Sequence, residues 1–311
     1  MQVLCAGQLA VDVIALPVED VDYAVDTLLV DRIEMKSGGD SMNVAAGLAT
    51  LNNDVAFIGR IGNDAFGLFL AQKFQALGID PKGLIQTKDV PTCSSVVLIN
   101  GAGDRTFIHC IGANERFVQE DVTDDQIAKA GIVHMGGTFT MPGIDGEGAA
   151  QLFKRARKAG ALTSMDVTYD SEHRWMNLIK PSLKDLDFFI PSINEAKYIA
   201  GTDDPDKIAD VLLSAGVKTA VIKLGAKGCL VANAQTRFRQ HGYKANVVDT
   251  TGAGDAFVAG FLSGIANALP LQECAKMACA AGSICVESIG AAPAAITPEN
   301  IQRKIKGLAG L

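Results

Sequence analysis

A glycine-rich turn in the last third of the chain has the composition of a site for phosphoryl transfer. It reads DTTGAGDAF over residues 249–257 and runs directly into a helix pattern of small and apolar residues. Glycines let the backbone approach an anion closely, and the N–H groups and dipole of a helix start favour negative charge there. Asp255 could then act as general base on a hydroxyl. The structural alternative is an aspartate that only caps the helix.

A second glycine-rich turn stands near the start of the chain and also enters a helix pattern. It reads SGGDSMNVAAG over residues 37–47. Asp40 and Asn43 are three residues apart and therefore share a helical face, where a carboxylate and an amide can bind sugar hydroxyls. The alternative is a helix capped by Asp40 or Ser41. Asp12 is a charge in an otherwise apolar strand run, and such a residue needs a partner or a ligand.

The elements that must position these residues alternate between strand and helix. Apolar runs separated by amphipathic helices predict a mostly parallel sheet covered on both faces, with ligands at the carboxyl ends of its strands. Strands are predicted at 132–135, 161–167, 186–190 and 219–223, and helices at 146–159, 195–200, 207–214, 253–269 and 271–286.

Two segments, about 11–37 and 91–112, break this alternation. They show a period of two and carry turn signals such as the NGAGD string at 100–104, which favours antiparallel strands or a hairpin. Both leave the predicted core and return to it. We therefore expect a small β-sheet lid over the site, which could also pair with the lid of a second subunit in a homodimer.

Composition narrows the class of protein. A length of 311 residues with 48% hydrophobic and 20% charged residues is typical of a globular domain. The net charge of −7 disfavours nucleic acid as a partner, and no apolar run reaches the roughly 18 residues that a membrane helix needs. The first residues lack the pattern of a secretory signal, and the seven cysteines are scattered. We expect a cytoplasmic protein with reduced thiols.

Three strings together resemble those of the PfkB (ribokinase-like) carbohydrate kinase family. They lie at 38–45, 58–67 and 249–257, and the resemblance extends over the whole chain. It implies a single domain over 1–311 with the ribokinase-like α/β fold, a three-layer α/β/α sandwich that has a mostly parallel central sheet and a small β-sheet lid. It also implies an ATP-dependent kinase that phosphorylates a hydroxyl of a small sugar.

The resemblance assigns roles to both turns. Asp255 is implied to be the base that deprotonates the acceptor hydroxyl, and Gly252, Ala253 and Gly254 are implied to form the anion hole. The positions that match the family's sugar contacts are Asp12, Gly38, Gly39, Asp40, Asn43 and, at a lid hinge, Asn114.

The resemblance also implies a nucleotide site built around a strand and its glycine-containing turn. Lys223 stands where many members carry threonine, and a cation beside a triphosphate makes physical sense, although a surface lysine at a strand end is the alternative. Cys279 matches a position near adenine. The implied nucleotide contacts are Lys223, Gly225, Gly228, Thr251, Gly254, Cys279 and Ser283.

Two metal sites are implied in the same way. Many members carry Asn-x-x-Glu, a motif linked to Mg²⁺ and its waters, whereas here Ser192 replaces the asparagine and Glu195 is retained. A hydroxyl can still bind a metal-bound water, so we expect Mg²⁺ to be held by the nucleotide and, through water, by Glu195. Several members also bind a monovalent cation such as K⁺. The matching residues are Asp249, Ser288 and Gly290, within the segment 288–293.

The acceptor is open among members of this family. Two carboxylates, Asp12 and Asp40, suit a neutral ribose- or fructose-like sugar. A sugar acid of the 2-keto-3-deoxygluconate kind would need a cation, and a nucleoside would need an aromatic platform. The candidate cations are Lys36, Arg105 and Arg174, and the candidate platforms are Phe107, Phe139 and Tyr169.

Other classes of protein fit less well. No G-x-G-x-x-G string and no Gly-Lys pair occur, which disfavours a nicotinamide enzyme and a P-loop NTPase. A non-catalytic sugar-binding protein on the same fold is the remaining alternative, and the intact Asp255 turn argues against it.

Overall fold

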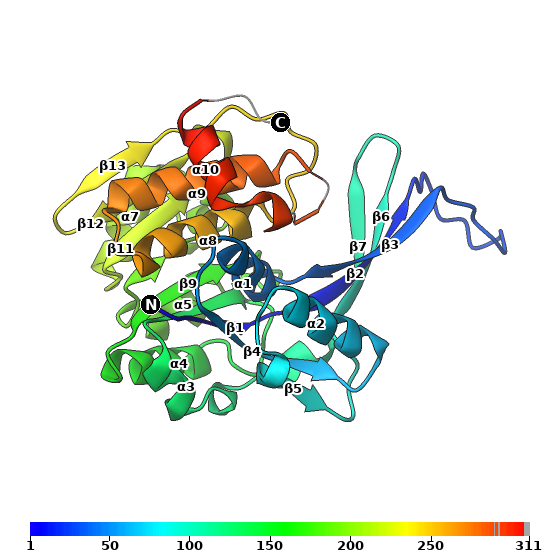
Figure 1. The fold of residues 1–311 in the computed structure, drawn as a ribbon, viewed down its shortest axis with the longest axis horizontal. Helices are drawn as coiled ribbons and strands as arrows, with labels where there is room; N and C mark the ends of the chain where they lie inside the picture. Colours follow the sequence, from blue (N-terminus) through cyan, green and yellow to red (C-terminus); the bar gives the residue numbers. More distant parts are fainter. Residues whose placement is uncertain (289, 292, 308–311) are drawn as a thin grey trace.

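A nine-stranded sheet forms the centre of the computed structural model, which describes residues 1–288, 290–291 and 293–307 (Figure 1). The strand order is β13-β12-β11-β10-β9-β8-β1-β4-β5. All pairs from β5 to β11 are parallel, and β12 and β13 add an antiparallel edge. The strands are β1 Val3–Gly7, β4 Val55–Gly62, β5 Leu84–Thr87, β8 Ile132–Thr138, β9 Leu162–Val167, β10 Phe188–Phe189, β11 Thr219–Lys223, β12 Cys229–Asn233 and β13 Arg237–Gln240.

Helices cover both faces of this sheet, because its central strands are apolar on both sides. One buried cluster joins the sheet to α1 Asp40–Thr50, α2 Ala65–Ala76, α8 Ala253–Ala266 and α9 Leu271–Cys285. The other joins it to α3 Asp124–Lys129, α4 Glu147–Lys158, α5 Trp175–Leu183, α6 Ile193–Ala200 and α7 Pro205–Ser214. The last helix, α10 Pro298–Ile305, packs on α9. The predicted three-layer sandwich is confirmed. Among the described residues, no helix combines the length and apolar character needed to span a membrane.

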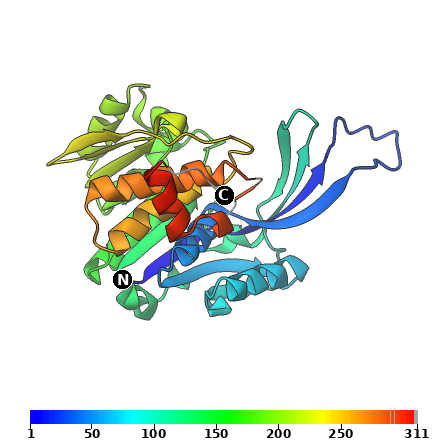
Figure 2. The same cartoon turned by 45° about the horizontal axis from the view of Figure 1, so that its top comes forward.

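A separate four-stranded sheet projects from one side of the sandwich, and Figure 2 shows it standing clear of the helices. Its order is β3-β2-β6-β7. The strands are β2 Ala10–Leu16, β3 Arg32–Gly38, β6 Ser94–Ile99 and β7 Arg105–Cys110. The two hairpins, β2 with β3 and β6 with β7, are antiparallel as expected, and β2 and β6 join them through a parallel pairing. Both strands leave the sandwich from the same base and must therefore run outward together.

The string at 58–67, one of the three that resemble the family, anchors this lid. Asp64 caps α2 by accepting from the Gly67 N–H at 2.8 Å, and its other oxygen accepts from the Thr92 N–H at 2.7 Å. The Thr92 hydroxyl also donates to Asp64 at 2.6 Å. One carboxylate thus joins a helix start to the base of β6. Its role is structural.

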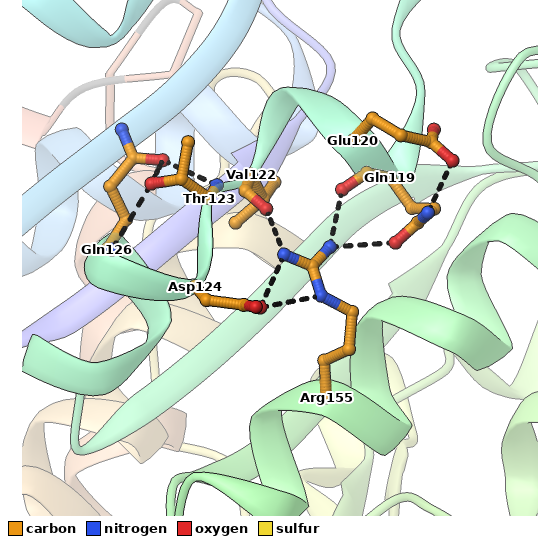
Figure 3. A network of polar contacts seen from close by, with 7 residues as sticks. All are labelled: Gln119, Glu120, Val122, Thr123, Asp124, Gln126 and Arg155. Atoms are coloured by element: carbon orange, nitrogen blue, oxygen red, sulfur yellow. Dashed lines mark hydrogen bonds and ion pairs between the residues drawn. The ribbon is translucent and has the colours of Figure 1, made fainter.

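Arg155 performs a similar task on the other face of the sheet (Figure 3). From α4 its guanidinium donates to the carbonyls of Gln119 and Val122 at 2.9 and 2.6 Å, and to the Asp124 carboxylate at 2.7 Å. These bonds satisfy backbone acceptors in and after the short 3₁₀ helix Gln119–Asp121 and hold α3 against α4.

Candidate active site

The turn at 249–254 delivers α8 to the carboxyl edge of the sheet in a shape that only glycine permits. Gly252 is the helix cap with φ 74°, and a Cβ there would lie 2.5 Å from the Cβ of Ala291. The helix begins at Ala253, so Asp255 stands in its first turn, buried but for 9% of its surface. The N–H groups at this helix start form an anion site with a carboxylate beside it.

The two glycine-rich strings meet at this carboxylate. The Nδ2 of Asn43 donates to Oδ2 of Asp255 at 2.8 Å, because α1 packs against α8. Asn43 was predicted to contact the sugar, and the structure places its amide on the predicted base. A donor on one carboxylate oxygen fixes the side chain and leaves the other oxygen to accept a proton.

A buried ion pair lies next to the anion site. Nζ of Lys223, at the end of β11, is 2.6 Å from Oδ2 of Asp166, and the two side chains are only 11% and 3% exposed. The ammonium is also 3.3 Å from the position that a Cβ would take on Gly254. Lys223 is therefore not the surface lysine of the alternative interpretation. Asp166 was not predicted, although a charge ending an apolar strand is the same signal that identified Asp12.

Burial perturbs the protonation of this cluster. Burial raises the pKa of Asp255 well above the ordinary aspartate value, and the charge of Asp40 raises it further, while Asn43 and Lys223 oppose the shift. Burial likewise raises the pKa of Asp40, and it raises that of Asp166 to about 7 against the opposing charge of Lys223. For Lys223 burial acts to lower the pKa, but Asp166 and Glu195 hold it above the ordinary lysine value.

The lid contributes a polar group of its own. Asp12 faces the same side of the lid as Ser95 and His109, its partners in register, and Gly38 leaves room for its carboxylate. Ser95 and Nδ1 of His109 are 3.0 Å apart. Burial raises the pKa of Asp12, and Ser95 and His109 oppose that shift. Ser95 and His109 were missed, and the period-two register of the lid was the signal that could have identified them.

The remaining predicted sugar contacts differ in access. Gly39 has φ 93°, and a Cβ there would lie 2.6 Å from Cα of Leu9. Glycine at this position therefore lets the backbone of the turn pack closely against Leu9, which precedes the lid strand β2. Asp40 receives a backbone hydrogen bond from Gly137. Asn114 is buried and donates through Nδ2 to the carbonyl of Leu9 at 3.0 Å, next to the first residue of the lid strand β2.

The predicted nucleotide residues also separate into two kinds. Gly225, with φ 59°, has open space where a Cβ would be, whereas a Cβ on Gly228 would collide with the carbonyl of Gln240. The thiol of Cys279 is buried against Sγ of Cys229 at 3.8 Å, and the Ser283 hydroxyl donates to the carbonyl of Ala280 at 2.8 Å. The turn beside Gly225 is therefore more open than the position on α9.

The predicted magnesium ligand has a structural task as well. Glu195 and Ser192 form a capping box at the start of α6, in which the Ser192 N–H donates to Oε2 of Glu195 at 2.8 Å. The Ser-x-x-Glu string is thus a helix-capping motif, a role that the interpretation as a metal site did not consider. Glu195 still acts electrostatically on Lys223, Asp40 and Asp166, so its charge belongs to the site.

Asp249, the predicted ligand of a monovalent cation, is already surrounded by donors. Its Oδ1 accepts from the Thr251 N–H at 2.9 Å and from Nη1 of Arg105 at 2.6 Å, and its Oδ2 accepts from the Gly290 N–H at 2.7 Å. Burial acts to raise the pKa of Asp249, but these donors hold it below the ordinary value. Ser288 follows α9, and residues 289 and 292 of the predicted segment lie outside the described residues.

The chain as a whole is similar to known proteins. Residues 1–298 match the family described as "pfkB family carbohydrate kinase". The probable chloroplastic fructokinase-6 of Arabidopsis thaliana is 30% identical over 97% of this chain and 82% of that protein. The structure of Arabidopsis thaliana ribokinase complexed with ribose and ATP superposes with a TM-score of 0.82 at 26% identity, over 98% of both chains. That of adenosine kinase from Sinorhizobium meliloti superposes with a TM-score of 0.83, also at 26% identity, over 97% of this chain and 98% of the other.

Proposed function

Because this chain belongs to the pfkB family of carbohydrate kinases, we propose that it transfers the γ-phosphoryl group of ATP to a hydroxyl of a small neutral sugar. The observation that carries the proposal is the meeting of Asn43 with Asp255 at the anion site, 2.8 Å apart, with Lys223 beside Gly254. A base, an anion-binding turn and a cation in one place are the parts that phosphoryl transfer needs.

The residues divide the chemistry between them. ATP with Mg²⁺ supplies the phosphoryl group and screens its charge when bound. Asp255 accepts the proton of the acceptor hydroxyl, and Asn43 keeps its carboxylate oriented. The N–H groups at 252–254 and the ammonium of Lys223 stabilise negative charge on the transferred group. The open turn at Gly225 fits a nucleotide, and the charge of Glu195 fits a Mg²⁺ ion held through water.

The side chains favour a neutral acceptor over a sugar acid. Arg174, one of the candidate cations, is engaged: its Nη2 donates to Oδ1 of Asp170 at 3.1 Å and to the carbonyl of Phe139 at 2.9 Å. Asp12 and Asp40, by contrast, offer carboxylates to hydroxyl groups. A nucleoside is the second candidate. Phe107 lies on the same lid face as Asp12 with about half its surface exposed, and one of the superposing structures is that of an adenosine kinase.

A coupled ADP-release screen tests this proposal. The acceptor panel contains neutral pentoses and hexoses, sugar acids, sugar phosphates and nucleosides, each with ATP and Mg²⁺. We expect turnover with a neutral sugar. Turnover restricted to nucleosides or sugar acids would replace the proposed acceptor, and absence of turnover with every acceptor would leave the non-catalytic sugar-binding protein as the better interpretation.

We propose, in addition, a homodimer formed through the lid. The lid face opposite Asp12 is apolar and exposed, with Ile33 and Ile108 at 67% and 61% exposure and Met35 and Val96 beside them in register. An exposed apolar face of this kind marks an interaction surface. The net charge of −7 gives no support to a nucleic-acid partner, and the seven free thiols suit a reducing cytoplasm.

The double variant Val96→Lys/Ile108→Lys is expected to be monomeric. Two ammonium groups on an apolar contact would be buried unpaired on association, which strongly disfavours it. Light scattering after gel filtration should show the mass falling from twice the 32.6 kDa of the chain to that value. Leu68→Lys, on the exposed side of α2, is the matched control and should leave the mass unchanged. A wild-type protein that is already monomeric contradicts the proposal.

A further inference from the structure

We propose that the lid supplies its own cation to the active site: the guanidinium of Arg105 takes the place of a monovalent metal ion at Asp249. The inference rests on the proposed kinase function, since it concerns the turn that binds the phosphates. It makes Arg105 a positioning residue for this turn. It also makes the enzyme independent of K⁺.

The contacts of Arg105 bridge the two parts of the molecule. Arg105 begins β7, at the outer end of the lid, and its Nη1 donates to Oδ1 of Asp249 at 2.6 Å and to the hydroxyl of Thr251. The guanidinium also lies 6.0 Å from the ring centre of Phe107, which supports its stem from the same lid face. Two of its acceptors therefore belong to the turn that leads into α8.

A guanidinium and a metal ion satisfy the same kind of site. The groups that Arg105 meets are oxygen atoms, a carboxylate and a hydroxyl, which are also the ligands of a hard monovalent cation. In both cases the positive charge neutralises Asp249 beside the anion site, and it ties the turn in one conformation. With Arg105 in place, Oδ1 of Asp249 already accepts from three donors and Oδ2 accepts from the Gly290 N–H. A K⁺ ion bound at Oδ1 would have to displace the guanidinium of Arg105.

Because Arg105 belongs to the lid, it shares one sheet with Asp12, the lid residue proposed to bind the acceptor. Asp12 and Arg105 are carried by one four-stranded sheet and face the same side of it. Lys36 lies on that side too, with Nζ 3.4 Å from the position of a Cβ on Gly290. A lid position that lets Asp12 reach an acceptor therefore also brings positive charge to residues 249–251 and 290. We therefore expect acceptor binding and the contact of Arg105 with the turn at 249–251 to be coupled, because one sheet carries both groups.

Salt identity separates this inference from a site that uses K⁺. The wild-type chain, Arg105→Gln and the matched control Arg32→Gln are compared in potassium chloride and in tetramethylammonium chloride at equal ionic strength. Arg32 lies on the same lid and pairs with Glu34, a residue of its own strand. Initial rates are measured with the acceptor found in the screen. Thermal unfolding midpoints are measured without nucleotide or acceptor, so this second readout does not depend on the kinase reaction.

We expect the wild-type rate to differ less than about twofold between the two salts, as does that of Arg32→Gln. Arg105→Gln should lose about 10- to 100-fold in tetramethylammonium chloride, the range for loss of a charge-assisted hydrogen bond, and potassium should restore at least about tenfold. Its unfolding midpoint should rise in potassium because the ion binds only the folded state.

Several outcomes would overturn the inference while leaving the kinase function intact. A wild-type rate that rises severalfold in potassium means that a metal ion, not Arg105, completes the turn. If the activity and the unfolding midpoint of Arg105→Gln are the same in both salts, Asp249 does not exchange one cation for the other. If no acceptor is found, the unfolding midpoints alone decide, and a potassium-specific rise confined to Arg105→Gln supports the inference.

Discussion

Asp255→Asn should lower turnover by about 10³-fold or more while nucleotide binding persists. The substitution keeps the shape of the side chain, and the amide oxygen can still accept from Nδ2 of Asn43. It removes only the ability to take up the proton of the acceptor hydroxyl. Calorimetric titration with ADP should give an affinity close to that of the wild-type protein, because the anion site is made by backbone N–H groups.

The pH profile gives the same prediction a second readout. The base acts only when unprotonated, so kcat/KM must rise with pH through the pKa of Asp255. Burial and the charge of Asp40 place that pKa well above the ordinary aspartate value. We therefore expect an acid limb at higher pH than an exposed carboxylate would give, and Asp255→Asn should abolish this limb in its residual activity.

A buried carboxylate at the opposite edge of the sheet provides the control. Asp187 accepts from the Thr163 N–H at 2.8 Å and from Nζ of Lys218 at 2.6 Å, at the amino end of β10. Asp187→Asn should change kcat less than about threefold, since it touches no part of the site. If Asp255→Asn retains more than a tenth of the wild-type rate, the base is another residue.

The features that depend on local sequence were predictable. Apolar strand runs and helix patterns at 132–135, 219–223 and 253–269 correspond to β8, β11 and α8, with ends that differ by up to three residues. The helix at 253–269 ends earlier because Ala268 adopts φ 55° and Pro270 is the N-cap of the next helix. Glycine strings likewise locate turns, because positive φ restricts those positions to glycine.

Features that depend on packing between distant segments were not predictable in this way. The contact of Asn43 with Asp255 joins residues 212 positions apart and requires the crossing of α1 and α8. Each residue was identified, but their mutual bond was not. The pairing of Asp166 with Lys223 similarly requires that β9 and β11, separated by β10, end at one edge of the sheet.

This buried pair carries the second prediction of large effect. Lys223→Met should lower kcat by about 10²–10³-fold, the loss expected when one group that stabilises charge in the transition state is removed. The ammonium lies beside Gly254 and within the influence of Asp255, so its charge acts where the phosphoryl group is transferred. Asp166→Asn should cost less, about tenfold, because Asp166 acts by holding Lys223 in place.

The two variants should move the acid limb of kcat/KM in opposite directions. Lys223 lowers the pKa of Asp255 and Asp166 raises it. Lys223→Met should therefore shift the limb to higher pH, and Asp166→Asn should shift it to lower pH. A purely structural pair would leave the limb where it is, so unchanged profiles in both variants would contradict a role in the reaction.

Stability must be separated from this effect on chemistry. Removing one member of a buried pair costs about 3–5 kcal/mol of unfolding free energy, because the other charge is left uncompensated. The double variant Lys223→Met/Asp166→Asn removes both charges and should recover most of that loss, as chemical denaturation would show. Its kcat should nevertheless stay as low as that of Lys223→Met, because the double variant still has no cation beside Gly254. Recovery of stability without recovery of turnover identifies the ammonium itself as the catalytic contribution.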